Sequence, residues 1–135
     1  SGTLNNWATY GTGNPWIASQ DTAQEGSWSA RALQTGAGED SFIEATFNPS
    51  NSNSITFEYY RKLVGLDTAD DFEVNYFSNG QWITLEHLGD ASENNDNFIF
   101  KSFTIPNTAT KIRFKCECGA VSEMCYVDNV KLLRQ

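Results

Sequence analysis

The chain has 135 residues, of which 39% are hydrophobic and 13% aromatic, and its 17 acidic and 9 basic residues give a net charge of −8. This length fits one domain that buries a real core, and the composition is not that of a disordered chain. A net negative charge repels nucleic acid and anionic membranes, so neither is an expected partner. No apolar run approaches the roughly 20 residues that span a bilayer.

Short segments of alternating apolar and polar residues follow one another along the chain. We expect an opening strand within 3–20, and further strands over 27–33, 41–47, 55–64, 72–77, 82–85, 98–105, 111–118 and 126–133. Asn79-Gly80 is typical of a two-residue hairpin turn. About nine strands at this spacing, without a helical period, predict an all-β sandwich with jelly-roll topology and two antiparallel sheets. We expect one domain over residues 1–135, with Ser1-Gly2 a remnant of cloning or processing.

The last expected strand contains a carboxylate among apolar residues. Val127 and Leu133 lie on one alternation phase, and Val130 and Leu132 lie on the other. This pattern indicates a strand covered on both sides, or one with an irregularity near Asp128. A carboxylate in such a strand has to be paired, hydrogen-bonded or bound to a cation.

The three cysteines, Cys116, Cys118 and Cys125, fall within ten residues. A zinc site is the minor alternative, because no second cysteine pair follows and the one histidine, His87, is far away in sequence. In an exported protein, a disulfide from Cys116 or Cys118 to Cys125 is favoured, and one thiol is left over. The sequence does not decide between these two pairings.

Catalysis is not expected, because the chain lacks an acid/base or nucleophile constellation. His87 is interpreted as a surface histidine beside Glu86. Asp70, Asp71 and Glu73 form a carboxylate cluster such as a glycosidase uses. We interpret this cluster as a solvated loop end or a weak cation site.

Sugar binding needs flat aromatic faces beside hydrogen-bonding groups. Trp16 follows Asn14-Pro15 in a loop and is the best candidate for an exposed platform, with a buried loop anchor as the alternative. Trp28 and Trp82 fall within strand patterns and are expected in the core.

Alternation also predicts an outward sheet face that mixes aromatic and polar side chains. With the apolar phase inward, one sheet would display Glu58, Tyr60, Lys62, Glu73, Asn75, Phe77, Arg113 and Lys115. An internally paired, solvated face is the alternative interpretation. The predicted sugar-binding residues are Trp16, Tyr60, Glu73, Asn75, Phe77, Arg113 and Lys115.

The sequence resembles extracellular jelly-roll modules, which include MAM-like domains and the carbohydrate-binding modules of bacterial polysaccharide-degrading enzymes. The matching segments are Gly26-Ser27-Trp28-Ser29-Ala30-Arg31, Ile55-Thr56-Phe57-Glu58-Tyr59, Phe72-Glu73-Val74-Asn75-Tyr76 followed by Gly80-Gln81-Trp82, Lys111-Ile112-Arg113-Phe114 and Tyr126-Val127-Asp128-Asn129-Val130.

The resemblance implies a non-catalytic carbohydrate-binding module of a secreted multidomain protein, located outside the cell or on its surface. Its partner would be a polysaccharide or other glycan, and the module would be a monomer within a larger chain. A MAM-like protein-interaction or adhesion module without sugar binding is the alternative. The resemblance also implies a structural calcium, held by Asp128 with ligands among Asp21, Glu25 and nearby backbone carbonyls.

Overall fold

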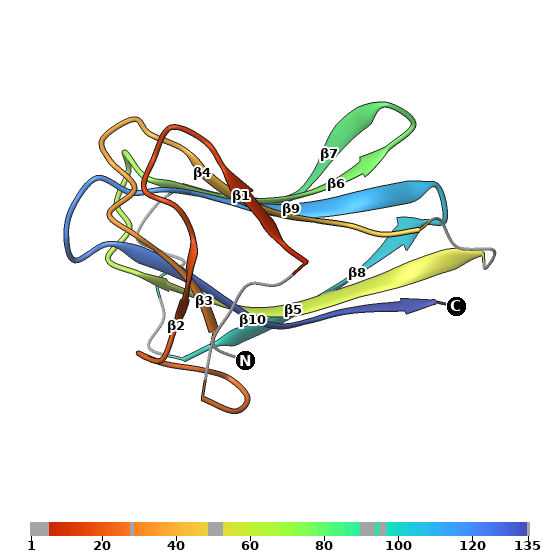
Figure 1. The fold of residues 1–135 in the computed structure, drawn as a ribbon, viewed down its shortest axis with the longest axis horizontal. Helices are drawn as coiled ribbons and strands as arrows, with labels where there is room; N and C mark the ends of the chain where they lie inside the picture. Colours follow the sequence, from red (N-terminus) through yellow and green to blue (C-terminus); the bar gives the residue numbers. More distant parts are fainter. Residues whose placement is uncertain (1–5, 28, 49–52, 90–93, 95–96, 135) are drawn as a thin grey trace.

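The computed structural model describes residues 6–27, 29–48, 53–89, 94 and 97–134, and these residues form ten strands and no helix (Figure 1). The strands are β1 (Ala8–Tyr10), β2 (Ile17–Ser19), β3 (Ser29–Leu33), β4 (Ser41–Thr46), β5 (Ser54–Val64), β6 (Asp71–Ser78), β7 (Gln81–Leu88), β8 (Ile99–Pro106), β9 (Ala109–Glu117) and β10 (Met124–Arg134).

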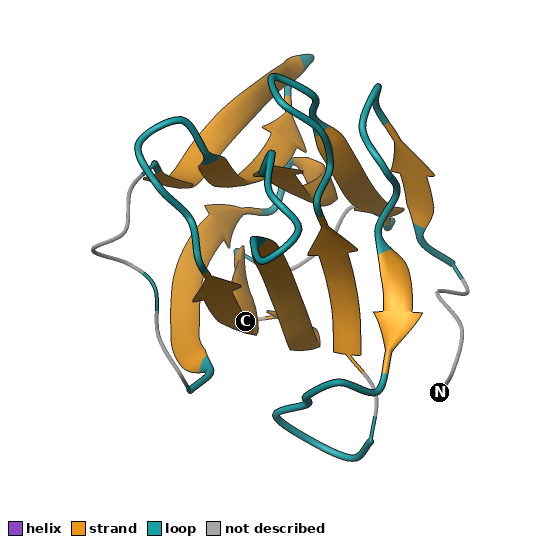
Figure 2. Ribbon diagram, turned by 90° about the vertical axis from the view of Figure 1, so that its left-hand side faces the viewer, coloured by secondary structure: helices purple, strands orange, loops and turns teal. Residues whose placement is uncertain are grey.

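Two five-stranded antiparallel sheets face each other. The first sheet has the order β1-β4-β9-β6-β7, and the second sheet has the order β2-β3-β10-β5-β8. Figure 1 shows them as two layers, and Figure 2 looks along the strands from the end where several long loops gather. The predicted all-β sandwich with two antiparallel sheets is confirmed. Strand β2, which pairs with β3 at the sheet edge, was not predicted because three residues are too few for an alternation pattern.

The core lies between the sheets and is built from the inward phase of each strand. Along β5, residues alternate between buried and half-buried from end to end, as expected for a strand with one face on the core. Phe114 of β9 lies at the centre of this core. Its ring is 5.1–6.4 Å, between centroids, from the rings of Trp7, Phe57, Tyr59 and Phe72.

The irregularity expected near Asp128 is present in β10. The register against β5 shifts between Asp128 and Lys131, and Asn129 has a φ of 49°. A bulge of this kind inserts extra residues and changes the alternation phase. Val127 therefore points inward before the bulge, and Leu132, which pairs with Phe57, points inward after it.

A disulfide between Cys116 and Cys125 joins β9 of the first sheet to β10 of the second. This pairing confirms the predicted disulfide to Cys125 and identifies Cys116, rather than Cys118, as its partner. Cys118 is the remaining thiol and is buried. A zinc site that uses all three cysteines is contradicted, because two of them are covalently joined.

One ion pair lies inside the core. Arg61 of β5 and Glu86 of β7 come from opposite sheets, and their side chains are 3% and 6% exposed. Glu86 points inward because the β6–β7 register shifts between Val74 and Asn75, which leaves Leu85 as an extra residue. Among the described residues no helix is long and apolar enough to cross a membrane.

Candidate functional site

Most of the predicted sugar-binding residues lie together on the outer face of the first sheet. Glu73, Asn75 and Phe77 of β6 pair with Lys115, Arg113 and Lys111 of β9, respectively. Directly paired residues in antiparallel strands point to the same side of a sheet. Since Val74 of β6 and the alternate residues of β9 are buried in the core, these six side chains point away from it.

Tyr60 does not belong to this group. It pairs with Phe100 of β8 and Asp128 of β10, and so it lies on the outer face of the second sheet, as do Glu58 and Lys62. The prediction that one sheet displays all eight outward residues was therefore wrong. Alternation along β5 gives the correct side of the strand, but the sheet to which β5 belongs depends on pairing with β8 and β10.

Trp16 is not an exposed platform. Its side chain is 2% exposed, and its indole N–H donates a hydrogen bond to the carbonyl oxygen of Ser41 at 2.9 Å. The alternative interpretation, a loop anchor, describes it correctly. A buried tryptophan needs an acceptor for its N–H, and strand β4 provides one 25 residues along the chain. Trp28 lies outside the described residues.

Trp82 lies on the outer face of the first sheet and not in the core. The two-residue turn Asn79-Gly80 pairs Phe77 with Trp82, so both side chains point outward. Their ring centroids are 5.1 Å apart in an edge-to-face arrangement. Trp82 is half-buried by its neighbours on the sheet and not by the opposite sheet.

Two further aromatic residues on this face were not predicted. Tyr10 of β1 and Phe42 of β4 pair in register, and their rings stack with centroids 4.9 Å apart and planes within 8° of parallel. Tyr10 is 41% exposed. The side chains form a continuous row across the sheet, which we call the aromatic row: Tyr10, Phe42, Arg113, Trp82 and Phe77.

Arg113 joins the two halves of the aromatic row. Its guanidinium carbon lies 4.8 Å from the ring centroid of Phe42 and 3.9 Å from that of Trp82. Its Nε donates to Asn75 Oδ1 at 3.0 Å, and its Nη1 donates to the Tyr10 hydroxyl at 3.3 Å. Cation–π contacts and hydrogen bonds together fix the plane of this guanidinium on the sheet.

The Tyr10 hydroxyl connects Arg113 to Glu44. Burial raises the pKa of Tyr10 more than the neighbouring Arg113 lowers it, so the hydroxyl stays protonated. It donates to Glu44 Oε1 at 2.8 Å. The aromatic row therefore has a hydrogen-bonded rim.

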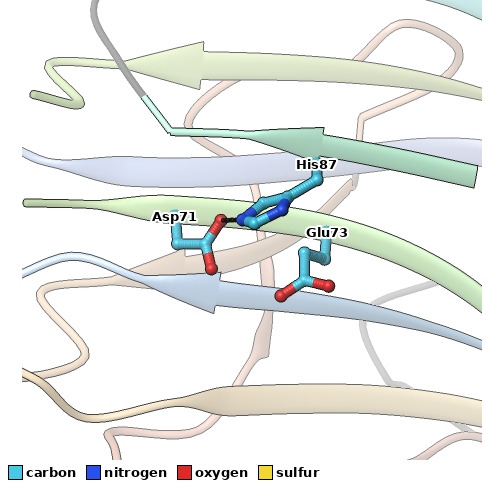
Figure 3. Close-up of side chains that lie close together, drawn as sticks. All are labelled: Asp71, Glu73 and His87. Carbon is cyan, nitrogen blue, oxygen red and sulfur yellow. Dashed lines mark ion pairs between the residues drawn. The ribbon is translucent and has the colours of Figure 1, made fainter. Parts of the chain in front are cut away.

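A cluster of charged side chains lies on the same face, beside Phe42 of the aromatic row, which pairs with Lys115. Figure 3 shows three of its members, Asp71, Glu73 and His87. Lys115 Nζ lies 2.8 Å from Asp71 Oδ2 and 2.7 Å from Glu73 Oε2, and His87 Nε2 lies 2.8 Å from Asp71 Oδ1. Burial alone would raise the pKa of Glu73, but its hydrogen bond and charge interaction with Lys115 outweigh this and lower the pKa. Asp71, Glu73 and His87 are close enough for a metal ion, but Lys115 already supplies the positive charge between the carboxylates.

The residues predicted to hold calcium do not gather their carboxylates in one place. Asp128 Oδ2 accepts the backbone N–H groups of Gln24 and Glu25 at 2.8 and 3.0 Å, and Asp128 Oδ1 accepts that of Asn129 at 2.7 Å. Asp21 instead forms an ion pair with Arg31. N–H donors therefore contact both oxygens of Asp128, and a calcium site at Asp128, Asp21 and Glu25 stays a prediction.

We expect the Asp128 carboxylate to stabilise the fold through these N–H bonds. Asp128→Ala leaves the backbone donors without their acceptor and should cost about 1–3 kcal/mol. Thermal unfolding with calcium and with EDTA separates the two interpretations. If EDTA leaves the unfolding midpoint of the wild-type protein unchanged, the hydrogen bonds explain the role of Asp128. If EDTA lowers the midpoint of the wild-type protein but not that of Asp128→Ala, calcium is bound.

No protein-family model matches the sequence, and no curated protein matches it. Solved structures do match in fold. TmCBM61, solved in complex with β-1,4-galactotriose, has a TM-score of 0.69 at 12% identity, over 99% of this chain and 92% of that chain. The C-terminal family 22 carbohydrate-binding module of Clostridium thermocellum Xyn10B has a TM-score of 0.63 at 17% identity, over 99% of this chain and 88% of that chain.

An adhesin domain shares the fold as well. The K3 cleaved adhesin domain of Lys-gingipain from Porphyromonas gingivalis has a TM-score of 0.67 at 13% identity, over 97% of this chain and 91% of that chain. At such identities the likeness establishes the fold. The chain therefore has the β-sandwich fold of carbohydrate-binding modules, as its sequence resemblance implied.

Proposed function

We propose that this chain is a non-catalytic carbohydrate-binding module that binds a polysaccharide over the outer face of the first sheet. The aromatic row is the observation that supports this most directly. Aromatic rings contact the apolar side of a sugar ring at low entropic cost, since few rotatable bonds have to be fixed. Hydrogen-bonding groups flank the rings, as hydroxyl recognition needs: Thr84, Arg113, Glu44 and Glu73. Asn75 is 3% exposed and positions Arg113 and Thr84 through its amide group.

The charges on this face support a non-catalytic role. A glycosidase needs one carboxyl group that stays protonated to act as general acid. Lys115 lowers the pKa of Glu73, which favours the ionised carboxylate, and Lys115 also forms an ion pair with Asp71. Glu117, at the end of β9, is the exception, since burial and nearby carboxylates raise its pKa, but it lies beyond Lys115 from the aromatic row.

We place the module outside the cell, in a secreted or cell-surface multidomain protein. The Cys116–Cys125 disulfide supports this location, because disulfides persist in oxidising compartments. In that setting the module holds an attached domain near a polysaccharide.

A MAM-like or adhesin-like interaction module is the second candidate, favoured by the shared fold of the Lys-gingipain adhesin domain. Protein docking favours a contiguous apolar patch. The exposed large apolar side chains among the described residues instead come from different elements: Tyr10, Ile17, Ile83, Phe100, Val121 and Leu133. Tyr10 and Ile83 lie on opposite edge strands of the first sheet, and Ile17 and Phe100 lie on opposite edge strands of the second. This separation favours the sugar-binding proposal.

Affinity gels that contain plant, algal or bacterial polysaccharides test the proposal. We expect at least one polysaccharide to retard the wild-type domain, and Trp82→Ala to weaken that retardation about tenfold. Phe100→Ala is the matched control, because Phe100 is an exposed aromatic on the opposite sheet. No retardation on any polysaccharide, or loss in Phe100→Ala with none in Trp82→Ala, would contradict the proposed site.

A further inference from the structure

The three cations that β9 displays on the outer face differ in their partners. Lys115 lies within 4 Å of three carboxylates, those of Asp40, Asp71 and Glu73. Lys111 lies 3.9 Å from Glu44. Within the described residues, no carboxylate oxygen lies within 4 Å of the Arg113 guanidinium.

This arrangement is unusual for a chain with a net charge of −8, in which acidic residues outnumber basic ones almost two to one. Glu44 pairs in register with Arg113, yet it contacts Arg113 only through the Tyr10 hydroxyl. The guanidinium charge is therefore not neutralised by direct contact with a described carboxylate. It lies at the middle of the aromatic row, where a bound sugar would contact it.

The guanidinium is also held in place before any ligand arrives. Phe42 and Trp82 lie on its two sides, and Asn75 and Tyr10 accept from Nε and Nη1. Among the described residues, no acceptor lies at hydrogen-bond distance from Nη2. A fixed side chain with an unused donor loses little entropy on binding.

We propose that the polysaccharide bound by this module carries an anionic group, either the carboxylate of a uronic acid or a sulfate ester, and that Arg113 binds this group. This inference rests on the proposed carbohydrate-binding function. Planar guanidinium groups match carboxylate and sulfate oxygens with paired N–H donors, and such charged hydrogen bonds are stronger than those to neutral hydroxyls. Lys111, which is on the same strand as Arg113 and pairs with Phe77 of β6, adds a second positive charge to this face.

The rest of the protein does not prevent this interaction. Screening limits exposed charges to about 8 Å at physiological ionic strength, so distant acidic residues have little effect on Arg113. The carboxylates on the same face lie beside other cations: Glu44 lies 3.9 Å from Lys111, and Asp71 and Glu73 form ion pairs with Lys115. Because the chain has a net charge of −8, it does not attract polyanions in general. A preference for anionic polysaccharides would therefore require a specific site.

Affinity gels with two matched pairs of polysaccharides test the inference. One pair is polygalacturonate and its carboxyl-reduced form, and the other is a sulfated galactan and its desulfated form. We expect the charged member of one pair to bind at least about tenfold tighter than its neutral counterpart. The pair that shows the preference identifies carboxylate or sulfate as the recognised group.

The Arg113→Gln variant should bind the charged and the neutral member of that pair with similar affinity. Its binding to the neutral member shows that the rest of the face is intact. Lys131→Gln is the control, because it removes one charge from an exposed position on the second sheet. It should leave the preference unchanged. Equal wild-type binding within both pairs, or a preference that survives Arg113→Gln, overturns the inference and leaves the proposed function standing. No binding to any polysaccharide, charged or neutral, overturns both.

Discussion

Removing either partner of the Arg61–Glu86 ion pair is expected to destabilise the fold by about 3–5 kcal/mol, because the remaining buried charge would lose the hydrogen bonds and the ion pair that join the two side chains. Both side chains are almost fully buried, and three hydrogen bonds of 2.9, 3.0 and 3.2 Å join Arg61 to the two Glu86 oxygens. The Tyr59 hydroxyl also donates to Glu86, and Lys101 Nζ lies 3.5 Å from it. For a chain of this size, the loss corresponds to a drop of roughly 10–20 °C in Tm.

The comparison of Arg61→Met, Glu86→Leu and the double variant tests this prediction. The double variant removes both charges and fills the space with apolar side chains, so we expect it to be more stable than either single variant. Urea unfolding of all three measures the difference. Single variants that lose less than about 1 kcal/mol would contradict a desolvated pair.

The same pair predicts a pH dependence of stability. Burial alone would raise the pKa of Glu86, but hydrogen bonds from Arg61 and Tyr59 outweigh it and hold the pKa below the ordinary value of 4.5. A carboxylate with a lowered folded pKa stabilises the fold fully above its unfolded pKa, and this contribution disappears as the pH falls through the folded pKa. Stability measured from pH 6 downward should therefore decline below about pH 4.5, and the decline should be smaller in the double variant.

The Cys116–Cys125 disulfide is expected to contribute about 2–3 kcal/mol, as estimated for a closed loop of roughly ten residues. It joins the two sheets next to the loop end of the sandwich. Cys125→Ala should therefore lower Tm by roughly 5–15 °C. Urea unfolding of the oxidised and reduced wild-type protein measures the same contribution.

Cys118→Ala is the matched control for the disulfide. Cys118 Sγ lies 3.7 Å from Cys116 Sγ but is not bonded to it. The variant should keep the disulfide, as detected by mass spectrometry, and should remain sensitive to reductant. A Cys118→Ala protein that has lost its disulfide, or a wild-type protein equally stable when reduced, would contradict the pairing.

Local patterns in the sequence predicted the fold well, because alternation and turn residues act over a few positions. The bulge at Asp128 was visible as apolar residues on both phases of one strand. The outward position of Trp82 could have been predicted from local patterns as well. The two-residue Asn79-Gly80 turn fixes its pairing with Phe77, and Phe77 was already expected to point outward.

Long-range pairing explains what the sequence did not predict. Tyr60 and Asn75 share an outward phase, yet they lie on opposite sheets because β5 pairs with β8 and β10, whereas β6 pairs with β7 and β9. Trp16 is buried against Ser41 from another strand. Glu86 points inward only because one extra residue in β7 changes its phase. None of these contacts leaves a periodic signal in the chain.

Mapping backbone amide shifts during an oligosaccharide titration tests the central claim most directly. The probes are β-1,4-galactotriose and trigalacturonate, which differ in charge and linkage, titrated into the isotope-labelled domain to millimolar concentration. We predict that the shifted amides cluster on β1, β4, β6, β7 and β9, around Tyr10, Trp82 and Arg113. Shifts that cluster around Tyr60 and Phe100 on the second sheet would contradict the proposed site, and binding of neither probe, together with no retardation on any polysaccharide, would contradict sugar binding itself.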